Sequence, residues 1–488
     1  MLDQRKRTIQ EAETYIQTHL SLVNPEYRPA FHAVAPVGWI NDPNGFCWFH
    51  GQYHLFGQYH PYSAKWGPMH WGHWVSPDLI HWEWAGVAMA PDQEYDQAGV
   101  FSGTALIEND VLIVMYTGVS LSPDGRLIQQ QCIARSTDGY HFEKDPRNPV
   151  IRSEDLPADV PADDFRDPKL FRTPDGYRAI MAARNAAGGE LLVYSSQDLA
   201  SWKLAGTCTE GISRMLECPD YHRIDGKDLL VFCAIGLPEA PGHFPSPHTA
   251  VYMTGSMNDQ YTAFQGISPE AVDMGLNFYA PQAADTPDGC ILTSWMPGPG
   301  GTIPTDDLGH QWAGCMVLPR QLHIREDRLY QKPVEAVRKL RRNKISIHQV
   351  MKPDQPFIGS HGKCFEWELK LKADHSVRME LFRSEGNGFL VTWDPASGML
   401  TMDRNGCGHD MSGKAPERVT AHLFTPGNAI TLNIFVDTCT VELFANEGER
   451  VMSANVYPKS NTYTWAILSD GQFEITGDCY ELAATTEV

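Results

Sequence analysis

Three carboxylates in short, distinctive strings carry the chemistry that this chain could perform. Asp42 lies in the string WINDPNG (39–45), Asp167 in RDP (166–168) and Glu217 in ECP (217–219). Pro43 favours an extended backbone at Asp42, and the Asn-Gly pair that follows is a strong turn signal. We therefore predict that Asp42 is a nucleophile held where a strand meets a turn.

Carboxylates of this kind suit hydrolysis of a glycosidic bond. That reaction needs one ionised carboxylate, which attacks the sugar or activates water, and one protonated acid, which donates to the leaving oxygen. Several carboxylates in one pocket repel one another, so one of them keeps a proton. Arg166, next to Asp167, supplies a counter-charge, and we expect it to keep Asp167 ionised for binding sugar hydroxyls. Each string alone also occurs in ordinary turns, so only the spacing of the strings along the chain indicates a shared site.

A repeat of sixty residues gives that spacing. The strings SPDLIHW (76–82), STDGYHF (136–142) and SQDLASW (196–202) begin at positions 76, 136 and 196, and 136 − 76 and 196 − 136 are both 60. A weaker copy begins at Ser256. Short β-rich runs separated by Gly, Pro, Asp and Asn fill the intervals, without helical periodicity. Units of this kind indicate a β-propeller, and about 300 residues accommodate five blades.

The innermost strands of a propeller line its axis, so the start of each unit predicts a site. Stepping back roughly 30 to 40 residues from each marker string leads to one short segment per unit. These segments contain Asp42, then Phe101 and Ser102, then Arg166 and Asp167, then Glu217, and in the fifth unit Tyr279. Three of the five inner strands therefore bring an acid to one axis.

The chain divides into four predicted segments. We expect an N-terminal helical extension (1–26), a five-bladed β-propeller (27–331), a short linker helix (332–344) and a β-sandwich (345–488). Alternating apolar and charged residues at 365–371 and 440–444 are typical of strands with one face in water. The basic run within 333–342 indicates a solvated face rather than a site for an anion.

Composition limits the partners and the compartment. Sixty acidic against 39 basic residues give a formal charge of −21, which disfavours nucleic acid and anionic membranes. Apolar runs are too short for a membrane span, and the start MLDQRKR lacks the apolar core of an export signal. Eleven cysteines without CxxC spacing indicate reduced thiols. We predict a cytoplasmic protein that binds a small neutral sugar.

Other reactive residues have plainer interpretations. Cys218 lacks an evident His or Asn partner and is interpreted as a small packing residue. His70 and His73 lack accompanying acidic or thiol ligands, so we interpret them as structural and predict no metal site.

Together the strings resemble glycoside hydrolase family 32, the family of invertases and sucrose-6-phosphate hydrolases. The resemblance covers nearly the whole chain and rests on seven strings in the family's order: WINDPNG (39–45), QYHP (58–61), WGPMHWGH (66–73), FSG (101–103), RDP (166–168), ECP (217–219) and FYA (278–280). It implies a five-bladed propeller followed by a C-terminal β-sandwich. It also implies retaining hydrolysis of terminal β-D-fructofuranosides such as sucrose, sucrose 6-phosphate or short fructo-oligosaccharides, without a cofactor.

The resemblance assigns roles to individual residues. Asp42 corresponds to the nucleophile, Glu217 to the general acid/base and Asp167 to the transition-state stabiliser. The carboxyl groups of Asp42 and Glu217 should lie about 5 to 5.5 Å apart, as in retaining enzymes. Residues matched to substrate binding are Trp39, Asn41, Gln58, Trp66, Phe101, Ser102, Arg166, Tyr279 and Trp295. The sandwich is implied to support packing or oligomer contacts, a homodimer among them.

Two departures and two rival functions accompany this resemblance. Asn277 and Gly57 stand where relatives carry Asp and an aromatic residue, which bears on the pocket rim and on substrate length. An inverting furanosidase acting on arabinose or xylose polymers would also use three carboxylates, but it would yield the opposite product anomer. A propeller that binds carbohydrate without cleaving it is the second rival. Lys65 is one candidate for contacting a substrate phosphate.

Overall fold

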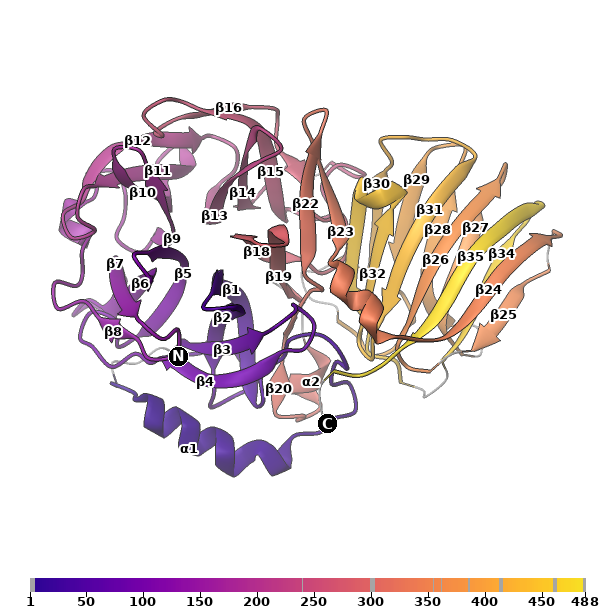
Figure 1. Cartoon of the computed structure of the whole chain (residues 1–488), viewed down its shortest axis with the longest axis horizontal. Helices are drawn as coiled ribbons and strands as arrows, with labels where there is room; N and C mark the ends of the chain where they lie inside the picture. Colours follow the sequence, from indigo (N-terminus) through magenta and orange to yellow (C-terminus); the bar gives the residue numbers. More distant parts are fainter. Residues whose placement is uncertain are drawn as a thin grey trace.

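The computed structural model describes residues 5–238, 240–298, 303–353, 355–360, 362–384, 387–411, 416–459 and 463–485. The outer limits of the predicted segments, residues 1 and 488, lie outside the described residues. The prediction of an all-β chain is confirmed, because strands form nearly all of the regular structure (Figure 1). No helix within the described ranges has the length and apolar character needed to cross a membrane.

Short helices flank the sheets. Thr8 caps the N-terminal helix by accepting a hydrogen bond from the backbone N–H of Glu11, whose side chain in turn accepts from Thr8, which is a capping box. The helical segments are α1 (Ile9–His19), η1 (Leu20–Leu22), η2 (Ser153–Asp155), α2 (Pro304–Asp307), η3 (Glu335–Leu340) and η4 (Asn446–Gly448).

Up to Pro333, the described residues form five sheets that follow one another along the chain and are antiparallel apart from the short pairing of β20 with β1. The first contains β1 (Gly38–Phe49), β2 (Gln52–His60), β3 (His70–Ser76) and β4 (Glu83–Met89), with β20 (Trp312–Ala313) parallel to β1. The second contains β5 (Gly99–Glu108), β6 (Val111–Leu121), β7 (Leu127–Ser136) and β8 (Glu143–Lys144). The third contains β9 (Phe165–Thr173), β10 (Gly176–Asn185), β11 (Gly188–Ser196) and β12 (Lys203–Glu210). The fourth contains β13 (Met215–Ile224), β14 (Lys227–Ile235), β15 (His248–Met257), β16 (Phe264–Gly266) and β17 (Glu270–Ala271). The fifth contains β18 (Tyr279–Thr286), β19 (Gly289–Met296), β21 (Cys315–Met316), β22 (Arg320–Arg325) and β23 (Arg328–Pro333).

The first strands of these sheets form a closed ring. Each of β1, β5, β9, β13 and β18 contacts the first strand of the next sheet, and β18 contacts β1 again. Figure 1 shows the five strands nearest the centre, with the later strands of each sheet further out. The short strand β20, which comes late in the chain, pairs with β1 and so adds a strand to the first sheet. This pairing joins the last part of the ring to the first.

The marker strings of the sixty-residue repeat are the turns between the third and fourth strands. In the first three sheets the marker serine is the last residue of the third strand, and it accepts a backbone hydrogen bond from the residue three positions later. That residue has a positive φ in each case, namely Leu79, Gly139 and Leu199. A shared turn geometry therefore explains the shared sequence.

After η3, the described residues form two six-stranded sheets (Figure 1, right). One is ordered β24 (Arg341–Met351), β35 (Phe473–Leu482), β26 (Phe365–Ala373), β31 (Ala429–Val436), β32 (Thr440–Ala445) and β33 (Arg450–Asn455). The other is ordered β25 (Phe357–Ser360), β34 (Thr464–Ser469), β27 (Val377–Ser384), β28 (Asn387–Asp394), β29 (Met399–Asp403) and β30 (Arg418–His422). A core of buried side chains such as Trp367, Trp393 and Ile434 lies between them.

The predicted linker helix is shorter than expected. Only Glu335–Leu340 is helical, as a single 3-10 segment, and the basic residues Arg341 and Arg342 already belong to strand β24. Arg341 donates to Glu366 and Glu368 of β26, the next strand but one in the same sheet, beyond β35. These ion pairs across the sheet favour strand over helix at this position.

Candidate active site

A bulge at the same level of each inner strand shapes the centre of the ring. In each bulge the inner strand advances by three residues while the second strand of the same sheet advances by two, so the inner strand carries one extra residue. The bulges span residues 40–43, 100–103, 166–169, 217–220 and 279–282. A bulge re-aims side chains and leaves one residue unpaired. Asp167, Cys218 and Ala280 have positive φ there, and each precedes a proline. The five bulges present the predicted site residues toward one another.

The position of Asp42 differs from the prediction. Instead of ending a strand, Asp42 lies in the middle of β1, between one register shift at Ile40/Pro43 and a second at Asn44/Cys47. The Asn-Gly pair forms the second bulge rather than a turn, with φ of +54° at Gly45. A turn and a bulge both use a residue with positive φ, so the same local sequence serves either.

Asp42 is held by neutral hydrogen-bond donors. Ser102 Oγ donates to its Oδ2 at 2.7 Å, and Asn41 Nδ2 donates to its Oδ1 at 3.1 Å. Asn41 is itself held, because Trp39 Nε1 donates to its Oδ1 at 2.7 Å. Burial raises the pKa of Asp42, with a contribution from the charge of Glu217, while the bonds from Ser102 and Asn41 lower it. Ser102 and Asn41, both matched to substrate binding by the family resemblance, thus orient the carboxylate of Asp42.

Glu217 is held by a cation and a phenol. Arg166 Nη2 lies 2.7 Å from its Oε1, and Tyr279 Oη donates to its Oε2 at 2.6 Å. Arg166 supplies the expected counter-charge to Asp167, whose Oδ2 lies 3.9 Å from its Nε, but its closest carboxylate partner is Glu217. The guanidinium also contacts Asp164 at 3.2 Å, so Arg166 lies among Asp164, Asp167 and Glu217. Its ion pair with Glu217 holds that carboxylate near the centre of the ring.

Asp167 lies deepest among these charges. Burial raises its pKa to about 7, the charges of Glu217 and Asp42 add to that rise, and Arg166 opposes it. Its Oδ2 accepts a hydrogen bond from the backbone N–H of Cys218 at 3.0 Å. Asp167 therefore holds a proton more readily than an ordinary aspartate, whereas the sequence predicted that Arg166 would keep it ionised.

Cys218 connects the carboxylates rather than merely packing. Its Sγ lies 3.6 Å from both Asp42 Oδ2 and Asp167 Oδ2, so the thiol sits between two acids on different sheets. Because the thiol and the Glu217 carboxyl belong to adjacent residues of one bulge, these contacts connect β1, β9 and β13.

Aromatic side chains surround these acids. Trp39 and Trp295 pack edge to face with ring centroids 5.7 Å apart, and Trp66 packs on Phe101 in the same manner at 5.9 Å. Trp66 is 47% exposed, which leaves an apolar surface open to a ligand. Gln58 is buried, and its Nε2 donates to Val100 O, so only part of its amide remains for a sugar.

Other predicted features lie away from the acids. Asn277 is buried and accepts from Arg404 Nη1 at 2.6 Å, so it joins the ring to the sandwich and does not form a pocket rim. His73 packs against His54, with a nitrogen–nitrogen distance of 3.0 Å, and His70 bonds to Pro68 O, as expected of structural histidines. Lys65 is exposed and faces Asp306 at 3.5 Å.

Sequence reasoning missed one contributor to the site. Thr117 on β6 accepts a hydrogen bond from the backbone N–H of Asp167 at 3.0 Å, which fixes the bulge from the neighbouring sheet. Thr117 belongs to no recognisable string, so its position on a strand gave no signal.

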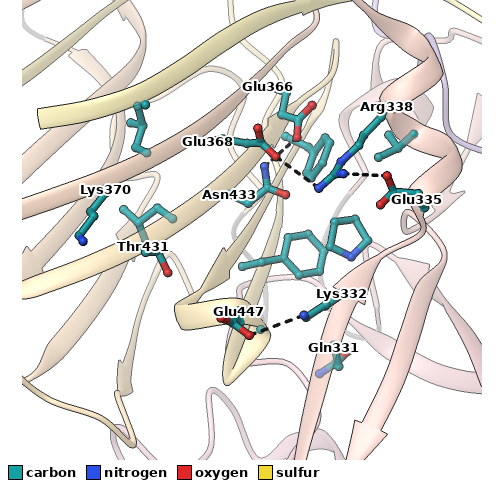
Figure 2. Close-up of a pocket in the computed structure, with 18 of the residues that line it drawn as sticks. Gln331, Lys332, Glu335, Arg338, Glu366, Glu368, Lys370, Thr431, Asn433 and Glu447 are labelled. Atoms are coloured by element: carbon teal, nitrogen blue, oxygen red, sulfur yellow. Dashed lines mark hydrogen bonds and ion pairs between the residues drawn. The ribbon is translucent and has the colours of Figure 1, made fainter. Parts of the chain in front are cut away.

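A separate cavity of about 470 Å³ lies between the ring and the sandwich (Figure 2). Figure 2 shows Arg338 between Glu335 and Glu368, and Lys332 facing Glu447. These charges neutralise one another in pairs. None of the three predicted catalytic acids lines this cavity.

Comparisons with known proteins point in one direction. The family profile described as "Glycosyl hydrolases family 32 N-terminal domain" matches residues 32–333, and "Glycosyl hydrolases family 32 C terminal" matches residues 333–481. A sucrose-6-phosphate hydrolase of Escherichia coli is 33% identical over 442 residues, covering 89% of this chain and 90% of that protein. A raffinose invertase of Escherichia coli is 32% identical over 468 residues, covering 91% and 94%.

Solved structures agree in fold. The sucrose-6-phosphate hydrolase of Lactobacillus gasseri superposes with a TM-score of 0.88 at 29% identity, covering 99% of this chain and 100% of that one. A mutant β-fructofuranosidase of Bombyx mori in complex with sucrose superposes with a TM-score of 0.83 at 28% identity, covering 98% and 99%.

Proposed function

Because this chain belongs to glycoside hydrolase family 32, we propose that it hydrolyses terminal non-reducing β-D-fructofuranosides of the sucrose type with retention of configuration. One observation carries the proposal. Asp42, Asp167 and Glu217 lie on inner strands of one closed ring, connected through Cys218 and Arg166. We interpret the five sheets as the blades of a propeller that brings these acids to its axis.

In the first step, an Asp42 oxygen attacks the anomeric C2 of the fructosyl unit. The C2–oxygen bond to the leaving group breaks as the new ester bond forms, and the proton of Glu217 passes to the departing oxygen. Ser102 and Asn41 hold the attacking carboxylate in place through the hydrogen bonds described above. A fixed nucleophile lowers the entropic part of the barrier.

In the second step, Glu217 takes a proton from water while the water oxygen attacks C2. The ester bond breaks, fructose leaves and Asp42 regains its negative charge. Arg166 and Tyr279 keep Glu217 in one place through both steps. Asp167, next to Cys218, is positioned for hydrogen bonds to sugar hydroxyls that strengthen as charge develops on the ring.

The similar proteins narrow the substrates. They include a sucrose-6-phosphate hydrolase and a raffinose invertase, and both sucrose 6-phosphate and raffinose carry a fructosyl unit like that of sucrose. We therefore propose sucrose and sucrose 6-phosphate as the main substrates. A cytoplasmic location and a homodimer stay predictions.

Fructose release tests this function. The purified chain and the variant Asp42→Asn are compared on sucrose, sucrose 6-phosphate, raffinose and kestose. We expect wild-type turnover on at least the first two and a loss of about 10³-fold or more in the variant, with the fold retained. Asp159→Asn, at an exposed position, is the matched control and should leave turnover unchanged. Normal cleavage by Asp42→Asn, or sugar binding without cleavage by the wild type, would contradict the proposal.

A further inference from the structure

A second cluster of reactive side chains lies at the other end of the inner strands. Among the described residues, one group brings three potential metal-ligating atoms within 4.8 Å of one another. It consists of His222, Asp285 and Cys290. Asp285 and Cys290 face each other across the β18–β19 hairpin, and His222 comes from β13 of the neighbouring sheet. His222 lies five residues beyond Glu217 on β13, which at about 3.3 Å per residue is about 16 Å from the acid/base.

The imidazole of His222 is aimed at this cluster, where its Nδ1 has an ion-pair contact with Asp285 but no hydrogen bond within the described residues. His222 is 5% exposed, and its buried Nδ1 makes no hydrogen bond to any residue within the described ranges. The nearest acceptor is Asp285 Oδ1, 3.4 Å from Nδ1. A buried ring nitrogen without a hydrogen bond is costly unless another ligand satisfies it.

The other ring nitrogen is held as in a metal-binding histidine. His222 Nε2 lies 3.1 Å from Asp220 Oδ1, and the second oxygen of Asp220 accepts from the backbone N–H of Ala283 at 2.6 Å. Lys169 Nζ lies 2.5 Å from Asp220 Oδ1 and 3.1 Å from His222 Nε2, and its positive charge lowers the pKa of the Asp220 carboxyl. Metal-ligating histidines usually donate their second N–H to a carboxylate in this way, which fixes the ring and makes the free nitrogen a ligand.

We propose that His222 Nδ1, Asp285 and Cys290 Sγ bind a divalent ion of the zinc type. A nitrogen, a carboxylate oxygen and a thiolate form a ligand set that zinc accepts, with water in the fourth position. Tetrahedral zinc with bonds of about 2.0 Å places nitrogen and oxygen ligands about 3.3 Å apart, close to the 3.4 Å between His222 and Asp285. The thiol sulfur needs to approach by up to about 1 Å to complete the site.

Access and charge fit such a site. A cavity of about 410 Å³ reaches His222 and Asp285 from this end of the ring, so an ion can enter without passing the catalytic acids. The Cys290 thiol is buried, and a bound cation would supply the positive charge that a buried thiolate requires. The ion would join β13 to the β18–β19 hairpin. It would thereby tie two neighbouring sheets together without taking part in sugar hydrolysis.

Zinc titration of the full chain tests the site. Protein stripped with a chelator is titrated calorimetrically with Zn²⁺, and Co²⁺ is used in parallel because a cobalt–thiolate bond gives a near-ultraviolet charge-transfer band. We expect one saturable zinc, a cobalt–thiolate band and a raised melting temperature in wild type. Cys290→Ser should abolish the band, and Asp285→Asn should weaken zinc binding by about tenfold or more.

Two features keep the test decisive. Asp285 is exposed, so its replacement leaves the core intact even if Cys290→Ser folds poorly, and Cys208→Ser serves as a buried-cysteine control away from the cluster. Absence of saturable zinc binding in wild type would overturn the proposal. Equal zinc affinity in wild type, Cys290→Ser and Asp285→Asn would also overturn it, because the ion would then lie elsewhere.

Discussion

Asp167 is a buried acid whose affinity for protons is set by its neighbours. Its pKa is raised to about 7 by burial and by the charges of Glu217 and Asp42, against the opposing effect of Arg166. In the unfolded chain an aspartate titrates near 3.9. The stability that its proton contributes to the fold is therefore fully present below about pH 4 and is lost as pH rises through about 7.

We predict that Asp167→Asn makes the protein more stable and less active. The neutral amide tolerates the positive φ at this position and removes an unfavourable buried charge. The gain in unfolding free energy should be near zero below about pH 4 and should grow to at most about 4 kcal/mol above about pH 7. Urea unfolding across this range measures it, with Asp159→Asn as an exposed control. A variant that is less stable than wild type above pH 7 would contradict the assigned charge balance.

Single site residues were predictable from the sequence where they lie at a similar distance before the marker string of their repeat. Asp42, Asp167 and Glu217 were found in that way, and the structure brings their sites together. The partners of these acids were less accessible to sequence, because Arg166 was assigned to its chain neighbour Asp167 while its closest partner is Glu217, 51 residues away. Thr117 gave no signal at all, since its contact to Asp167 arises only when two sheets meet.

At the scale of the element, the bulged inner strand is the device that builds the site. A regular strand would send Asn41 and Asp42 to opposite faces, whereas the extra residue at 40–43 changes their direction. The second bulge of β1 uses Gly45, where an added Cβ would lie 2.9 Å from the ring of Phe56 and 3.3 Å from that of Trp71. The strand of the nucleophile thus depends on glycine for both its φ and its packing.

We predict that Gly45→Ala lowers both stability and turnover. A positive φ costs a non-glycine residue about 1 kcal/mol, and contact with the two aromatic rings adds to that cost, for a total of about 2 to 4 kcal/mol. Gly51→Ala is the matched control, because Gly51 also has a positive φ but an added Cβ would meet nothing within 4 Å. Thermal unfolding and sucrose turnover of both variants check this. Equal effects of the two substitutions would show that packing at Gly45 has no role.

The inner strands could be predicted from the sequence, but the bulges within them could not. The Asn-Gly pair after Asp42 indicates a residue with positive φ, which a turn and a bulge satisfy equally. Pairing with β2 on one side decides between them, and that pairing depends on residues outside the string. The marker turns were easier to predict from the sequence, because the Ser and Asp side chains of Ser-x-Asp form hydrogen bonds with residues only a few positions away.

At the scale of the whole molecule, buried ions tie the ring to the sandwich. His32 lies before β1, and its two ring nitrogens lie 2.7 Å from Asp437 and 2.9 Å from Glu442, both from the sandwich part of the chain. Arg320 of the fifth sheet also contacts Glu442, at 2.8 Å. Burial lowers the pKa of His32, but hydrogen bonds to Asp437 and Glu442 outweigh that effect and raise it to about 10. His32 is therefore a cation at neutral pH.

We predict that His32→Gln destabilises the protein by about 3 kcal/mol near neutral pH, because it removes the positive charge beside buried Asp437 and leaves Glu442 with the charge of Arg320 alone. The contribution of His32 is fully present below about pH 6.5 and is lost as pH rises through about 10. The difference between wild type and variant in urea unfolding should therefore shrink toward pH 10. His141→Gln, at an exposed ion pair, is the control and should have little effect at either pH. A difference that is independent of pH would exclude a charged His32.

In the mechanism we propose, Asp42 forms a covalent bond to the fructosyl unit, and water then displaces Asp42 with Glu217 acting as the base. Two displacements at C2 retain its configuration, whereas direct attack by water inverts it. The direct test is the anomer of fructose released in the first moments of sucrose hydrolysis, followed by proton and carbon NMR at high enzyme concentration. We predict that β-fructofuranose appears first and that the other forms grow later by mutarotation. Initial release of α-fructofuranose would contradict the double displacement and would favour an inverting enzyme.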